Sequence, residues 1–172
     1  MIRARHLPEG CAVRRATPFD ARRIARGMRE PDRAEMEALE GCPALEVLQG
    51  WVTPHVTWMT SSPRVLTIRD EPCVIYGIAA SPGRAGHAAP WLALVSTLAD
   101  DDFTNVMWLS RLQVDAWQRR WPVLQTVCDV RNQFHRDWLD GLGFLRQGRV
   151  ESFGAAGLPF DLYRRAHITV LH

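Results

Sequence analysis

The stretch from Asp129 to Phe144 constrains the fold more than any other part of this chain. It overlaps an apolar run, Val123 to Val130, that favours a buried strand. Asn132 is a residue type that favours helix N-caps, and Gly141 and Gly143 are residue types that favour helix ends. The segment therefore predicts a strand, a polar turn, a helix of about three turns and a Gly-Phe exit.

The rest of the chain supplies elements on both sides of this unit. We expect strands at Cys11–Ala16, Val65–Arg69, Cys73–Ala80, Trp91–Thr97, Gly148–Ser152 and Phe160–Arg164, and helices at Ala21–Arg29, Asp32–Leu39, Ala44–Trp51 and Phe103–Arg120. Thr17 and Pro18 mark the first helix start, Pro31 a break and 81–89 a loop. The predicted fold class is α/β (α+β), in the order β-α-α-β-β-β-α-β-α-β-β. One mixed sheet of about six or seven strands is flanked by helices.

Length and composition limit the class of protein. With 172 residues, 47% of them hydrophobic and 23% charged, the chain fits one globular domain. We expect residues 1–10 to form a flexible arm and residues 11–172 the domain. No apolar run approaches the roughly 20 residues of a membrane span, and no apolar segment of a secretory signal follows the basic N-terminus.

All 21 basic residues are arginine, and the formal net charge is only +2. This charge is too small to argue for a nucleic-acid partner by itself, and we expect none. The arginines Arg22, Arg23 and Arg26 leave a nucleic-acid-binding accessory protein as a third possibility, although a solvated helix face explains them more simply.

The cysteines Cys11, Cys42, Cys73 and Cys128 contain no CxxC pair, and no histidine pair has zinc-finger spacing. The spacing therefore predicts no metal site. We expect reduced thiols in a cytosolic protein.

The element order, with Asn132, Gly143 and Phe144 at their spacings, resembles the GNAT acyltransferase fold. Several features of the C-terminal half resemble the GNAT-like internal virion protein A family of short-tailed phages. These are Pro90-Trp91-Leu92, Trp121-Pro122-Val123-Leu124, Asp129-Val130-Arg131-Asn132, Trp138-Leu139 and Leu142-Gly143-Phe144. The resemblance implies acetyl-CoA as a possible cofactor, with no cofactor firmly predicted. It also implies virion or host proteins as partners. It further implies a location in the host cytoplasm or in the virion.

The residues that would carry acyl transfer depart from that family's pattern. The family has a glycine-rich turn at the start of its long helix, where backbone N–H groups and the helix dipole hold a pyrophosphate. Here the segment 97–105 has no glycine and contains Asp100–Asp102, whose charges would repel a pyrophosphate or simply stabilise the helix start. The position of the family's general-acid tyrosine is Leu139, and neither Tyr76 nor Tyr163 replaces it in sequence.

Several residues remain candidates for a site. For cofactor binding we consider Asn132, which is first of all a helix cap, together with Ser96 and Thr97. For catalysis we consider His135, whose intrinsic pKa suits proton transfer at neutral pH, and Cys128 as a nucleophile. The alternatives are a surface histidine and an inert buried thiol. His87 could face a substrate groove.

Two main hypotheses follow from these residues. The first is a phage-type GNAT-fold protein with a degenerate acyl-CoA site, acting in virion assembly or as an ejected accessory protein. The second is an active acetyl-CoA-dependent N-acetyltransferase acting on a protein or a small amine. Trp117 and Trp121, beside Arg119-Arg120, could form a protein contact patch, whereas core packing is expected for Trp108 and Trp138. The sequence predicts no oligomeric state.

Overall fold

A computed structural model describes residues 7–53 and 62–166 as a seven-stranded sheet with five helices. The strands are ordered β1-β2-β3-β4-β5-β7-β6 across the sheet. In chain order the elements are β1 (Cys11–Arg15), α1 (Pro18–Gly27), α2 (Glu30–Glu40), α3 (Ala44–Val52), β2 (Arg64–Ile68), β3 (Glu71–Ala80), β4 (His87–Leu94), α4 (Asp100–Gln118), β5 (Val123–Asp129), α5 (Gln133–Gly141), β6 (Leu145–Phe153) and β7 (Leu158–Ala166). The α/β class, mixed sheet and element order are as predicted, and the third short helix expected at Ala44–Trp51 is present as α3.

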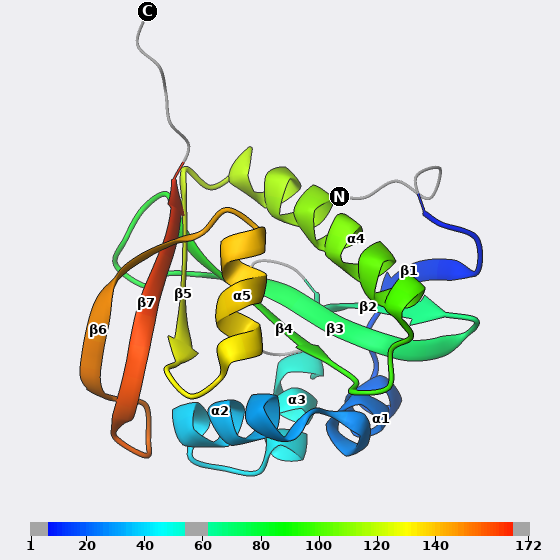
Figure 1. Ribbon diagram of the computed structural model, residues 1–172, viewed down its shortest axis with the longest axis horizontal. Coiled ribbons are helices and arrows are strands. Elements are labelled where there is room, and N and C mark those ends of the chain that lie inside the picture. The colour runs from blue at the N-terminus through cyan, green and yellow to red at the C-terminus, as the bar shows by residue number, and fades with distance from the viewer. Residues whose placement is uncertain (1–6, 54–61, 167–172) are drawn as a thin grey trace, which may run out of the picture.

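The sheet separates two hydrophobic clusters, because neighbouring strand residues point to opposite faces. Val65 and Ile75 pack in the cluster that contains α1 and α3, whereas Leu66 and Val74 pack in the cluster that contains α4 and α5. Figure 1 shows α4 on one side of the sheet and α1–α3 on the other.

The pairing of β4 with β5 decides where a site can form. Every other strand pair is antiparallel, but β4 and β5 run parallel. In the described sheet they pair at two positions, His87 with Val123 and Ala88 with Leu124. Beyond these positions the two strands separate, which leaves backbone groups of both strands facing a gap.

Local sequence explains how the starts of α1 and α5 are fixed. Thr17 and Asp20 form a reciprocal capping box at α1, with Pro18 in the first turn. Asn132 caps α5, its side chain accepting a hydrogen bond from the backbone N–H of His135. Gly143, at φ +78°, ends α5 in the left-handed region that glycine favours.

Some predicted boundaries were wrong. Strand β4 starts at His87 and ends at Leu94, so part of the predicted loop pairs with β3, and Ser96 and Thr97 lie beyond the strand. The glycines and proline of that loop are confined to 82–86, which leaves its last residues free to pair. Pro31 lies in the first turn of α2, where its missing N–H costs nothing.

The two helix tryptophans for which core packing was expected differ in burial. Trp138 is buried as expected, but Trp108 is exposed, because it lies on the outward face of α4. Residues 1–6 of the predicted arm lie outside the described residues. Within the described ranges, no helix is long and apolar enough to cross a membrane.

Candidate functional site

A cavity of about 150 Å³ occupies the gap between the separating strands. Its wall is mostly apolar, from residues of β4, β5, α4 and α5 that include Leu92, Leu94, Thr126, Leu109, Trp117 and Leu139. Its titratable lining groups are Tyr76 on β3, the α2 carboxylates Asp32 and Glu35, and His135 on α5, and α4 adds the uncharged polar residues Ser110 and Gln113. A mostly apolar cavity with a few convergent polar groups is the usual form of a small-molecule site.

Asn132 organises the polar end of this cavity. It is 2% exposed, and its side-chain amide donates hydrogen bonds to Asp32 Oδ1 at 2.8 Å and to Glu35 Oε2 at 2.7 Å. Its oxygen accepts from the backbone N–H of His135 at 3.2 Å. The amide nitrogen therefore holds α2 against the start of α5, and the oxygen caps α5 itself.

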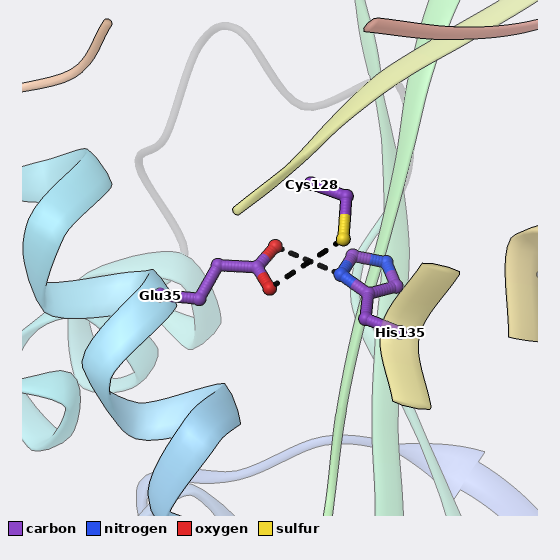
Figure 2. A group of neighbouring side chains, drawn as sticks. All are labelled: Glu35, Cys128 and His135. Atoms are coloured by element: carbon purple, nitrogen blue, oxygen red, sulfur yellow. Dashed lines mark hydrogen bonds and ion pairs between the residues drawn. The ribbon is translucent and has the colours of Figure 1, made fainter. Parts of the chain in front are cut away.

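Glu35 also joins Cys128 and His135 in a compact cluster (Figure 2). His135 Nδ1 lies 2.8 Å from Glu35 Oε1, and Cys128 Sγ lies 3.8 Å from Glu35 Oε2. Burial opposes charging of the imidazole, but the adjacent Glu35 carboxylate outweighs it and raises the pKa of His135 well above its ordinary value. Burial raises the pKa of the Cys128 thiol, although His135 partly offsets this.

Asp32 and Tyr76 are the other titratable groups of the cavity wall that have shifted pKa values. Burial raises the pKa of Asp32, against the opposing effects of the Asn132 hydrogen bond and the Arg29 charge. Asp32 Oδ2 lies 3.4 Å from Arg29 Nε but accepts no hydrogen bond from the described residues. Burial raises the pKa of Tyr76 to about 12, so its hydroxyl keeps its proton at neutral pH.

The start of α4 lies beside a second hollow, of about 510 Å³. Three arginines, Arg23, Arg26 and Arg69, line it with Glu71 and Asp102. Asp102 is buried and paired with Arg69 at 2.5 Å, whereas Asp100 and Asp101 are exposed. Among the described residues, no side chain caps this helix, so its first backbone N–H groups remain open to a ligand.

The predicted site residues fall into two groups. Asn132, Cys128 and His135 come together at the cavity end, although Cys128 is 0% exposed and does not line the cavity. Ser96 and Thr97 are exposed in the β4–α4 connection, where Thr97 borders the arginine-lined hollow and the Ser96 N–H donates to Gly27 O at 2.7 Å.

His87 and the tryptophan pair lie apart from the cluster. His87 sits at the paired end of β4 and β5, away from the point where they separate. Trp117 lines the cavity and forms an edge-on contact with Tyr76. Trp121 lies under the guanidinium of Arg120, and its part in a protein contact patch stays a prediction.

Sequence reasoning missed Asp32 and Glu35, and it rejected Tyr76 because its position in the chain does not match that of the family's tyrosine. The two carboxylates are three residues apart on α2, a spacing that places them on one helix face. The sequence contains this spacing, but two carboxylates on one helix face are equally typical of a solvent-exposed face. Only the contact with Asn132, about 100 residues away in the chain, distinguishes it.

Solved structures with this arrangement are GNAT-fold acetyltransferases. The aminoglycoside acetyltransferase AAC(6')-Ib, in complex with ribostamycin and coenzyme A, has a TM-score of 0.65 at 19% identity over 92% of this chain and 94% of its own. RimL, a ribosomal L7/L12 α-N-protein acetyltransferase in complex with coenzyme A, has 0.67 at 13% identity over 93% and 96%. The ribosomal-protein-S5-alanine acetyltransferase of Vibrio fischeri has 0.65 at 14% identity over 96% and 97%.

These likenesses show that the chain has the GNAT fold. No protein-family model matches the sequence, and no curated protein matches it.

Proposed function

We propose that this protein binds an acyl-coenzyme A between β4 and β5 and transfers the acyl group to an amine of a protein or small molecule. The observation that carries the proposal is the separation of these strands after Ala88 and Leu124, around a cavity with polar groups at one end. Coenzyme A is present in the structures of AAC(6')-Ib and RimL, which share the fold.

The residues present fit such a ligand in two places. The unpaired edges of β4 and β5 offer backbone hydrogen bonds to an extended chain such as pantetheine. At the start of α4, open backbone N–H groups and the arginines of the second hollow favour a pyrophosphate. The pairing of Asp102 with Arg69 removes part of the repulsion that the acidic start of α4 would otherwise exert.

Acyl-CoA supplies an activated thioester when it is bound, and the protein must then manage protons. Asp32 has an oxygen without a hydrogen bond and a raised pKa, so it suits the role of proton acceptor from an amine. The Tyr76 hydroxyl, protonated at neutral pH, suits the role of proton donor to a thiolate, in place of the tyrosine that Leu139 replaces.

The first test is calorimetry of the full chain with acetyl-CoA and with CoA, followed by thiol release with a panel of small amines and N-terminal peptides. Asp32→Asn should lower the turnover about 100-fold or more while changing the acetyl-CoA affinity little. Asp137→Asn, an exposed change on α5, is the matched control. Absence of acetyl-CoA binding by the folded wild-type protein would contradict the proposal.

A second candidate is a phage-type GNAT-fold protein without transferase activity, associated with the virion or with a host partner. The acidic start of α4 and the buried Leu139 favour it. If the protein has this second function, acetyl-CoA does not bind, or it binds and no acyl group is transferred. Crosslinking of the full chain in infected cells, with identification of the captured virion or host proteins, tests the partner.

A further inference from the structure

The cluster of Glu35, Cys128 and His135 brings together three different metal-binding atoms. The carboxylate of Glu35 comes from α2, the thiol of Cys128 from β5 and the imidazole of His135 from α5, and Figure 2 shows the three groups pointing toward one another. Their ligand atoms all lie within 4.8 Å of one another. We infer that this cluster is a zinc site with three protein ligands and a fourth position toward the cavity.

The donor set selects the metal. One sulfur, one nitrogen and one carboxylate oxygen are the ligand types that zinc takes, whereas magnesium and calcium require mostly oxygen ligands. A thiolate and a carboxylate together balance the charge of Zn²⁺. The ion would therefore sit in this buried place as part of a neutral group.

Two of the distances, each to a different oxygen of the Glu35 carboxylate, lie on either side of the spacing that a tetrahedral ion needs. Zinc bonds of about 2.0–2.3 Å separate neighbouring ligand atoms by about 3.3–3.6 Å. Cys128 Sγ and Glu35 Oε2 are 3.8 Å apart, whereas His135 Nδ1 and Glu35 Oε1 are 2.8 Å apart. A movement of about half an ångström at the imidazole, with the proton leaving, would admit the ion.

The surroundings support a site with an open position. Asn132 donates to Glu35 Oε2 and so orients the carboxylate from outside, as residues behind metal ligands commonly do. Glu35 and His135 line the cavity, but the fully buried Cys128 does not. The thiol therefore forms the closed side of the site, and the cavity supplies water or substrate to the fourth position.

Metal content tests the inference directly. The full chain is stripped with a chelator, incubated with Zn²⁺, desalted and assayed by mass spectrometry. We expect one zinc per chain, none in Cys128→Ser and Glu35→Gln, and one in Cys73→Ser, a buried thiol of β3 that serves as the matched control. Asn132→Ala should weaken zinc binding about 10- to 100-fold.

Cobalt binding to the wild-type chain tests the same site without any variant, so it still applies if a variant fails to fold. Co²⁺ bound to the wild-type chain should show a near-ultraviolet thiolate-to-cobalt charge-transfer band and the strong visible bands of a four-coordinate ion. No retained zinc in the folded wild-type chain, or cobalt bound without the thiolate band, overturns the inference. Full zinc content in a folded Cys128→Ser variant overturns it as well. Neither readout depends on acyl-CoA, so the zinc site and the proposed function can fail separately.

Discussion

Helices α4 and α5 follow the two strands that separate, yet their first turns differ in burial and hydrogen bonding. The start of α5 is closed, because Asn132 is buried and all its side-chain hydrogen bonds are made within the protein. The start of α4 is open, because Asp100 and Asp101 are exposed and no described side chain caps the helix. Similar positions in the fold thus form a fixed frame at the start of α5 and an exposed helix start at α4, where we propose that the pyrophosphate binds.

The largest effect on stability is expected from removing the side-chain cap at the start of α5. Asn132→Ala removes the cap of α5 and leaves the partly buried Asp32 and the buried Glu35 without their amide partner. We expect the free energy of unfolding to fall by about 2–4 kcal/mol, measured by urea denaturation. Gln133→Ala, at the exposed next position, should change it by less than about 0.5 kcal/mol. Equal losses in the two variants would show that the network contributes nothing.

A smaller effect with a pH signature is expected at Asp129, just before the α5 start. Burial acts to raise the pKa of its carboxyl, but the hydrogen bonds from Arg131 outweigh burial and hold the pKa below its ordinary value. Its stabilisation is therefore present above the unfolded pKa, near 4, and is lost as pH falls through the lower folded pKa. Asp129→Asn should cost about 1–2 kcal/mol at pH 7. The difference from wild type should vanish in acid, and a pH-independent difference would contradict this account.

Changes at the exposed start of α4 should lower the free energy of unfolding and raise the affinity for acetyl-CoA. Replacing Asp100 and Asp101 with asparagine removes charges that favour the helix, so unfolding should become easier by about 0.3–1 kcal/mol per residue. The same change removes repulsion from a pyrophosphate and should tighten acetyl-CoA binding about tenfold, measured by calorimetry at low salt. The double change of Asp137 and Asp140 to asparagine, both exposed on α5, controls for net charge. Unchanged affinity in the double variant would place the phosphates elsewhere.

The smallest effect is expected from the arginine-lined hollow. Arg26→Ala should weaken acetyl-CoA binding about fivefold at low salt, with less effect at high salt because the charge is exposed. Arg22→Ala, exposed on the same helix but not among the residues lining the hollow, should leave the affinity unchanged. Equal effects of the two changes would indicate a diffuse charge effect without a site.

Much of the frame could be predicted from local chemistry. Thr17 and Pro18 mark the start of α1, Gly41 ends α2, and Asn132 with Gly143 bounds α5, because capping depends on a few neighbouring residues. The boundaries of β4 were harder. Alanines 88 and 89 have no strong strand preference, and only their pairing with β3 places them in the sheet.

Some features of the candidate site could likewise be predicted from the sequence, whereas others depend on the tertiary structure. The sequence by itself determined the fold class, the α5 cap and the departures at Leu139 and Asp100–Asp102, because residue type and spacing carry that information. Only the tertiary structure decided that Glu35 meets Cys128 and His135, residues 93 and 100 positions away. Spacing rules recognise metal ligands on one local motif, whereas these three residues meet through the packing of α2 against the β5–α5 turn. The physical reason is that contacts between distant elements depend on how whole surfaces pack, which no short pattern encodes.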